Sequence, residues 1–332
     1  MKIKRCERNE YSALLDMLNA AFGHPASGPG AHFFERNVSM ATPFIDDASD
    51  EMIARHMIAI DGGEVIGCVG AYPCTMLEAG GRRIGAYGIG QVACDSRFRG
   101  MGVMTSLMSE QLKDADAQGR SLGFLGGSRH RYKNFGFDFG GFRVDFAFDP
   151  KHIDAGRSAM RPMEAADIPA LMNMHEKFPV RIERTPEYWV RLLKRENYAG
   201  YVSGDLSAYA FALSRGPALD EKSVITEVQG DPSAALALVG DICGKRGERN
   251  ERGERNERSN EHSGERNERG EAKRVKPRNI TVQHPYLPAC GDPVYNALYS
   301  ACEHFCIYPA CLARVSGGLD AGNFWIPAID KI

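Results

Sequence analysis

The sequence predicts a mixed α/β fold made of two successive units of similar plan. A glycine-rich strand at 85–94 leads into a tight loop and then a helix whose apolar residues recur at helical spacing. Residues 55–94 form the pattern of an antiparallel meander with glycine turns. From Met160 the order of a first strand and a first helix begins again. We therefore expect two domains, at 1–150 and 157–332, each a mostly antiparallel mixed sheet flanked by helices.

The elements of the first unit follow from hydrophobic periodicity and turn residues. A glycine turn at 61–63 separates two runs that alternate in the manner of a hairpin. The alternation of apolar and polar residues from Phe142 to Phe148 favours a last strand that closes this unit. The expected order is a strand at 2–5, a helix at 10–22, strands at 55–60, 64–72, 75–77 and 82–94, a helix from about 103, and a strand at 121–125.

The loop before the long helix has the form R-x-x-G-x-G and runs from Arg97 to Val103. Gly100 and Gly102 leave no side chain where a ligand must approach, so amide hydrogens at the helix start can donate to an anion such as a pyrophosphate. The alternative is an ordinary strand-to-helix turn in which the glycines only relieve backbone strain. A dinucleotide-binding motif needs a third glycine and a nucleotide P-loop needs G-K-[ST], and neither follows.

A second motif follows the helix and the next strand. Gly119 stands where a helix commonly ends, and 132–137 reads Y-K-N-F-G-F. Together with V-A-C-D-S-R-F-R-G-M-G-V-M at 92–104, this resembles the acyl-CoA-binding and Y-x-x-x-G-F motifs of the GCN5-related N-acetyltransferases (GNAT). The resemblance implies that two neighbouring parallel strands of the first domain splay apart and that the pantetheine arm of acetyl-CoA inserts between them.

The resemblance also implies which residues bind this co-substrate. Backbone groups of Val92, Ala93 and Cys94 would bind the pantetheine. Amides of the loop would hold the pyrophosphate: Arg97, Phe98, Arg99, Gly100, Met101, Gly102 and Val103. The side chains that screen the remaining phosphate charge would be Arg97, Arg99, Arg129 or Arg131.

The implied reaction is transfer of an acetyl group to a primary amine by direct attack in a ternary complex. A backbone amide at Val92 or Cys94 would stabilise the oxyanion, and Tyr132 would protonate the departing thiolate. A core tyrosine packed beside phenylalanines is the alternative for Tyr132. The general base stays open among these groups: Glu64, His130, the loop acids Asp46, Asp47 and Asp50, and the carboxylate of Ile332.

The second unit lacks the R-x-x-G-x-G loop. At the matching place stands Gly230-Asp231-Pro232, where the proline has no amide hydrogen and the aspartate is negative, so no second acyl-CoA site is expected. The tandem plan resembles the first two domains of enhanced-intracellular-survival acetyltransferases. No residues are left for the third, sterol-carrier-like domain of those proteins, so an aminoglycoside acceptor is not carried over. We expect the second domain to be a degenerate copy without catalysis, with strands at 207–213, 224–228 and 280–283 and helices at 188–193, 233–243 and 294–306.

A charged insert at about 245–276 repeats G-E-R-N-E-R. Its composition predicts a solvated loop or a charged helix. An RNA-binding arm is the alternative, but each repeat contains equal numbers of glutamates and arginines, so their electrostatic fields cancel. The C-terminal cysteines, among them Cys302, Cys306 and Cys311, suggest zinc, but without a C-x2-C pair we expect core thiols and no metal.

Composition limits the remaining classes of function. The 332 residues carry a net charge of −2, which gives no case for a nucleic-acid or membrane partner. Nine scattered cysteines and the absence of an apolar leader indicate a cytoplasmic protein with reduced thiols. The expected partner is a small-molecule or peptide amine, and a homo-oligomer is left open. The alternative function is a catalytically silent acyl-CoA-binding or regulatory protein with the same fold.

Overall fold

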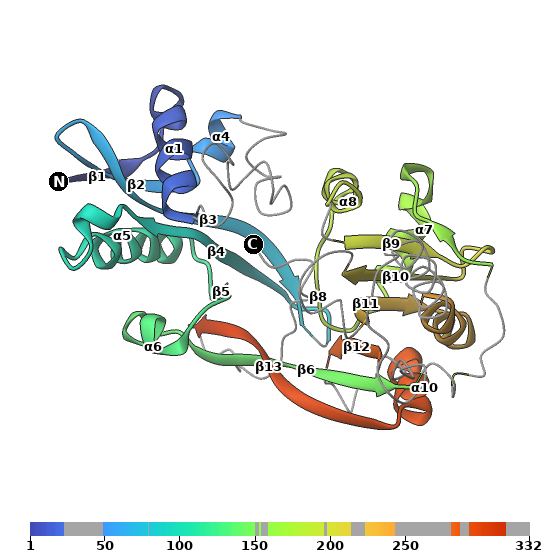
Figure 1. Cartoon of the computed structure of the whole chain (residues 1–332). Coiled ribbons are helices and arrows are strands. Elements are labelled where there is room, and N and C mark those ends of the chain that lie inside the picture. Colours follow the sequence, from blue (N-terminus) through green and yellow to red (C-terminus); the bar gives the residue numbers. More distant parts are fainter. Residues whose placement is uncertain are drawn as a thin grey trace, which may run out of the picture.

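The computed structural model describes residues 1–22, 49–78, 80–149, 153, 159–195, 198–213, 223–242, 280–285 and 292–316. The expected loop at 24–44, the acids Asp46 and Asp47, the insert at 245–276 and Ile332 lie outside these residues. The strands join in one 13-stranded mixed sheet that runs through both units (Figure 1), in the order β1-β2-β3-β4-β5-β13-β6-β12-β11-β10-β9-β7, with β8 paired to β3. The predicted fold class, tandem α/β units of mixed sheet flanked by helices, is confirmed, with the difference that the strands of both units join in one sheet.

The first unit is an antiparallel meander followed by a parallel crossover. Its strands are β1 (Lys2–Arg5), β2 (His56–Asp61), β3 (Glu64–Leu77), β4 (Arg83–Cys94) and β5 (Leu122–Leu125). Its helical segments are η1 (Arg8–Glu10), α1 (Tyr11–Phe22), α4 (Asp50–Ile53), η3 (Ser96–Phe98), α5 (Val103–Ala117), α6 (Arg129–Tyr132) and η4 (Lys133–Phe135).

Alternation along the strands sends side chains to two separate cores in this unit. Ile58 packs with α1 in one cluster, whereas its neighbours Met57 and Ala59 pack with α5 in another. The two helices therefore cover opposite faces of the sheet, as Figure 1 also shows. The connection between β4 and β5 runs through α5, which is the crossover that a parallel pair requires.

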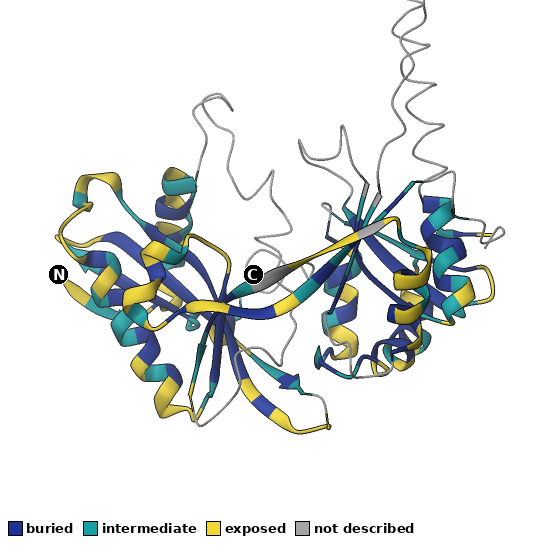
Figure 2. Ribbon diagram, turned by 90° about the horizontal axis from the view of Figure 1, so that it is seen from below, coloured by how far each residue is buried: buried dark blue, intermediate teal, exposed yellow. Residues whose placement is uncertain are grey.

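Two long strands cross between the units. β6 (Asp138–Phe148) and β13 (His304–Val315) pair along most of their length, and the end of β13 from Leu312 to Val315 also pairs with β5. The other edge of β6 pairs with β12 (Ile280–Pro285) of the second unit. Figure 2 shows this crossing ribbon between the two halves of the molecule.

This exchange corrects the expectation that Phe142–Phe148 is the last strand that closes the first unit. β13 lies between β5 and β6, and Val144, Phe146 and Phe148 are buried in the core of the second unit. The helix expected at 294–306 is also shorter: α10 (Pro293–Ala301) ends before β13 begins. Local periodicity marks a strand but does not say which sheet receives it. Cys306 is exposed on β13, so the expectation of a core thiol is wrong there.

The second unit repeats the plan of the first. Its strands are β7 (Arg161–Pro162), β8 (Arg181–Ile182), β9 (Tyr198–Val202), β10 (Ala208–Leu213) and β11 (Ser223–Gly230), and its helical segments are η6 (Ala165–Asp167), α7 (Ile168–His175), α8 (Pro186–Leu193) and residues 232–242. β11 and β12 are parallel, as β4 and β5 are. β8 adds to the far end of β3, where Ile182 pairs with Met76, so the units share a core there as well as a sheet. In the part of the chain that the structure describes, no helix has the length and apolar character needed to cross a membrane.

Candidate functional site

Strand β4 continues beyond the point at which its parallel neighbour β5 ends. They pair in parallel over four residue pairs, of which the last is Ile89 with Leu125. β5 ends there, whereas β4 continues to Cys94. Within the described part of the chain, no strand pairs with Gly90–Cys94 on this side. This unpaired edge of β4, from Gly90 to Cys94 beyond the end of β5, is called the gap below.

A β-bulge bends β4 where the gap begins. Cys68 lies opposite Ala93 and Gly70 lies opposite Gly90, so Gln91 and Val92 together face the single residue Val69. Gln91 takes a φ of +47°, which is uncommon for a residue with a side chain.

A buried network holds this bulge. The Tyr72 hydroxyl donates to Gln91 Oε1 at 2.5 Å, and His56 Nε2 lies 2.7 Å from the same hydroxyl. All three side chains are buried. Burial lowers the pKa of His56 to about 4, so its imidazole is neutral at physiological pH. The sequence analysis missed this network; a glutamine inside an otherwise apolar strand was its one visible signal.

Strand alternation shows which backbone groups of β4 face the gap. The amide of Asp95 donates to the carbonyl of Ile66 on β3. Since successive residues of a strand direct their backbone groups to opposite sides, those of Cys94 and Val92 point away from β3 and into the gap. Ala93 pairs with Cys68 of β3, so its backbone groups point to the other side. The two oxyanion candidates thus face the gap, whereas Ala93 does not.

The loop before α5 has an open backbone. Gly100 and Gly102 have φ values of +80° and +76°, and beyond the adjoining residues no described atom lies within 4 Å of the position that a Cβ would take at either residue. The positive φ at both positions explains why the sequence has glycine there. The loop from Arg97 to Gly102 is largely exposed, so it faces solvent rather than the protein interior.

Four of the backbone amides that were predicted to bind the pyrophosphate instead donate hydrogen bonds within the loop. The amide of Arg97 donates to Asp95 Oδ1 at 2.8 Å, and those of Phe98, Arg99 and Met101 donate to carbonyl oxygens three residues earlier. In the described chain, the amides of Gly100, Gly102 and Val103 have no such partner. The next two amides, of Met104 and Thr105, belong to the first helical turn, which has no intrahelical acceptor. The anion-binding candidates therefore shift toward the helix and include two residues that the sequence analysis did not name.

The four candidate arginines divide into two pairs. Arg97 contacts Asp95 at 2.8 Å and Glu64 at 2.9 Å, and Arg129 pairs with Asp138 at 2.7 Å. Arg99 and Arg131 are exposed, and no ion pair to either exists among the residues placed by the structure. The second pair is thus available to a phosphate without breaking an existing contact.

Tyr132 lies at the end of α6, just beyond the gap. It is 8% exposed, its ring packs edge-on against Phe137, and a side chain at Gly127 would collide with it. Its hydroxyl is not among the enclosed unpartnered atoms, and it bonds to no other residue of the described chain. Burial raises its pKa, which keeps the phenol protonated at neutral pH.

The described base candidates lie on the surface. Glu64 is held by Arg97, and Asp50 contacts Arg8 at 2.8 Å. His130 is exposed on α6. The remaining candidates, Asp46, Asp47 and Ile332, fall outside the described residues. The choice of base stays open.

A cavity of about 310 Å³ lies between the two units. Residues from α4, β3 and β5 form one wall, and residues from β8, α8 and the turn after α8 form the other. Tyr72 and Phe124 lie on the wall from the first unit. Sequence reasoning could not find this cavity, because its walls come from separate segments spread from Met52 to Arg195.

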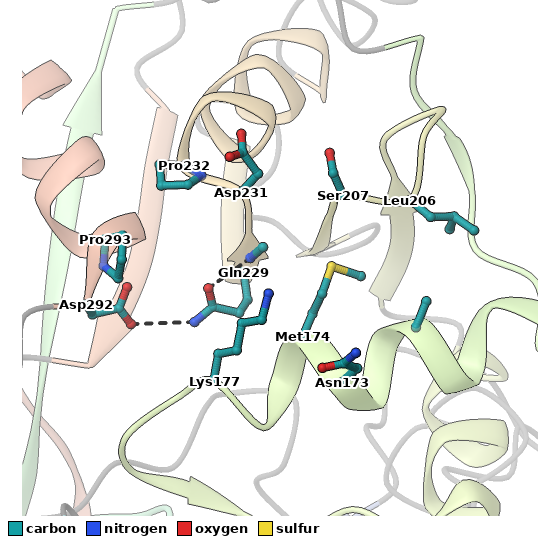
Figure 3. Close-up of a pocket in the computed structure, with 12 residues that line it drawn as sticks. Asn173, Met174, Lys177, Leu206, Ser207, Gln229, Asp231, Pro232, Asp292 and Pro293 are labelled. Carbon is teal, nitrogen blue, oxygen red and sulfur yellow. Dashed lines mark hydrogen bonds between the residues drawn. The ribbon is translucent and has the colours of Figure 1, made fainter.

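The second unit has a parallel strand pair at the matching place but not the open loop. β11 and β12 pair only from Ser223–Ile225 with Ile280–Val282, and a cavity of about 490 Å³ lies at the end of β11, between α7 and the start of α10 (Figure 3). Asp231 Oδ1 accepts from the amides of Ser233 and Ala234, both at 3.0 Å. The helix start that would bind an anion is therefore already capped by the protein's own carboxylate.

Comparison with known proteins identifies the first unit. Residues 2–140 match the model of the acetyltransferase (GNAT) domain family, and they contain the bulged strand, the open loop and Tyr132. The first unit is a GNAT domain. No curated protein matches the sequence.

Solved structures extend the likeness of this GNAT domain to the tandem fold. A GCN5-related N-acetyltransferase from Anabaena variabilis ATCC 29413 is 13% identical, with a TM-score of 0.64 over 95% of this chain and 72% of that one. A GCN5-related N-acetyltransferase from Kribbella flavida is 18% identical, with a TM-score of 0.62 over 95% and 71%. Eis1 from Mycobacterium abscessus is 16% identical, with a TM-score of 0.57 over 95% and 74%. At these identities the likeness shows the fold, including the two-domain arrangement.

Proposed function

We propose that the protein is an N-acetyltransferase that transfers an acetyl group from acetyl-CoA to a primary amine, with catalysis in residues 1–150. The observation that supports this proposal is the gap beside β4, where β5 has ended. It begins at a bulge, is lined by outward-facing backbone groups of Val92 and Cys94, and ends near an exposed loop with free amides.

The residues fit an acyl-CoA molecule in three places. The backbone of Val92 and Cys94 offers a strand edge to the pantetheine amides. The amides of Gly100 and Gly102 and of the first turn of α5, with the positive end of its dipole, suit the pyrophosphate. Arg99 and Arg131 supply cationic side chains for the phosphates.

The chemistry then needs little from side chains. Bound acetyl-CoA supplies an activated thioester. An amide at Val92 or Cys94 would donate to the acyl oxygen as negative charge develops there during attack by the neutral amine. Tyr132, kept protonated by its raised pKa, would give its proton to the thiolate that leaves.

The test is a thiol-release assay with acetyl-CoA against a panel of amino acids, peptides, polyamines and aminoglycosides. We expect amine-dependent release of CoA, and we expect Tyr132→Phe to lower kcat by roughly 100-fold with little change in CoA affinity. Tyr299→Phe, an exposed tyrosine on α10, is the matched control. An unchanged kcat in Tyr132→Phe would remove this residue from the mechanism. CoA binding without release in the presence of any amine would favour the silent binding protein.

A further inference from the structure

The cavity between the two units has an apolar lining that comes from both of them. Met52, Tyr72, Phe124 and Ile182 line it, and each of these side chains is buried. Phe124 and Ile182 also belong to the core cluster that the units share where β8 meets β3, so the lining continues that core. Tyr188 of α8 adds a half-buried aromatic ring from the second unit. A ligand in this cavity would therefore contact aromatic and aliphatic side chains of both units.

The charged residues of this cavity already have partners. Arg55 Nη2 donates to Glu51 at 2.9 Å, and Glu183 accepts from Arg83 at 2.6 Å. The two lining arginines on α8 and in the turn after it also have interactions of their own. A charged ligand would have to displace such contacts, whereas an apolar ligand would not. The apolar lining is thus the part of the cavity that can receive a ligand without loss of existing contacts.

This cavity adjoins the place where transfer would occur. Phe124 pairs with Gly88 and directly precedes Leu125, the last residue of β5 that pairs with β4. Tyr72 hydrogen-bonds to Gln91 in the bulge. The cavity therefore begins where the gap begins. It lies on the sheet face that carries α4, opposite the face covered by α5.

We propose that this cavity receives the acceptor and that the acceptor is a monoamine with an aromatic or branched apolar skeleton, of the arylalkylamine class. This inference rests on the proposed acetyltransferase function. Apolar surface that leaves water for a buried apolar lining stabilises the complex, and the rings of Tyr72, Phe124 and Tyr188 suit an aromatic group. A polyamine or an amino sugar would lose water from its charged groups or hydroxyls and would meet polar groups that are already engaged.

The experiment compares amines that differ in a single feature. Phenethylamine with ethylamine tests the ring, and pentylamine with cadaverine tests a second charged group on the same carbon chain. For each amine, kcat/KM is measured by thiol release, and binding to the protein saturated with CoA is measured by calorimetry. The variants are Tyr188→Ala, which removes a ring from the lining, and Tyr188→Phe, which keeps it. Tyr299→Ala, the same change at an exposed tyrosine outside the lining, is the matched control.

We expect phenethylamine to be used at least about tenfold better than ethylamine, because each apolar carbon that fits such a pocket raises kcat/KM. Pentylamine should exceed cadaverine by a similar factor, because the second ammonium group of cadaverine would lose its water. Tyr188→Ala should lower kcat/KM for phenethylamine by about tenfold and change that for ethylamine by less than about twofold. Tyr188→Phe and Tyr299→Ala should match the parent protein. Because each ratio is compared across variants, differences in amine pKa cancel.

The two proposals fail in different ways. Equal use of ethylamine and phenethylamine, a preference for cadaverine, or an undiminished preference for phenethylamine in Tyr188→Ala would overturn the acceptor class and leave the transferase intact. If no amine is acetylated but phenethylamine binds and loses affinity in Tyr188→Ala, the cavity assignment stands and the transferase is wrong. If the amines neither react nor bind, both proposals fall.

The variants are expected to fold, because Tyr188 is only half-buried, and circular dichroism verifies that they do. If Tyr188→Ala does not fold, the two amine pairs still test the acceptor class on the unaltered protein.

Discussion

Replacing Tyr72 with phenylalanine tests whether the buried network sets the shape of β4. The tyrosine hydroxyl lies 2.7 Å from His56 Nε2 and 2.5 Å from Gln91 Oε1, so the change removes both contacts at once without creating a large cavity. Buried groups that lose a hydrogen bond cost about 1–3 kcal/mol. For a domain of this size that corresponds to a decrease in Tm of roughly 2–10 °C.

The loss of these two hydrogen bonds should also slow acetyl transfer. Gln91 has a φ of +47°, an unfavourable conformation that the hydrogen bond of its side chain helps to maintain. The next residue, Val92, directs its backbone amide into the gap. We expect kcat for acetyl transfer to fall by roughly tenfold, about 1.4 kcal/mol, while the affinity for CoA at the distant loop stays near normal. Thermal denaturation followed by circular dichroism, steady-state kinetics and CoA titration measure the three quantities. An unchanged Tm together with an unchanged kcat would refute the role given to this network.

Three further predictions concern stability. Burial lowers the pKa of His56 to about 4, so between about pH 6.5 and pH 4 the unfolded chain binds a proton at this residue and the folded chain does not. The free energy of unfolding should therefore fall by up to roughly 3 kcal/mol as the pH is lowered to 4. Denaturant titrations should show a smaller fall in His56→Gln. Gly123→Ala would place a Cβ 2.6 Å from the buried Tyr87 ring and should lower Tm, unlike Gly85→Ala, whose nearest neighbour is 3.8 Å away. A chain ending at Asp149 lacks β13 beside β5 and should aggregate in size-exclusion chromatography; a folded monomer would contradict this.

Local patterns predicted the parts of the site that local chemistry determines. The helix at α5 follows from its periodicity, and glycine at positions 100 and 102 agrees with the positive φ that the loop takes there. The absence of a phosphate loop in the second unit was also visible, since Asp231 and Pro232 are adjacent in sequence. In each case the deciding residues lie within a few positions of one another.

Features that depend on distant segments were not predictable in this way. The residues of β13 are rich in aromatic and apolar side chains, but nothing local shows that they pair with β5 nearly 200 positions earlier. Arg97 looked suited to a phosphate, yet Glu64 from the start of β3 holds its guanidinium. The bulge at Gln91 depends on Tyr72 and His56 from two other strands, and the single visible signal was a polar residue in an apolar run.

The exchange of strands shows a structural role for the second unit, which has no phosphate loop. β5 has one neighbour in its own unit, and its other edge is covered only because β13 arrives from the second unit. Arg314 on β13 then pairs with Asp116 of α5 at 2.7 and 2.8 Å and donates to the Tyr87 hydroxyl at 3.4 Å, which ties this strand to the helix and to β4. β8 and α8 of the second unit complete the cavity whose other wall is β3. The second unit is therefore needed even without an anion site of its own, because it covers the open edge of β5 and supplies one wall of the cavity beside β3.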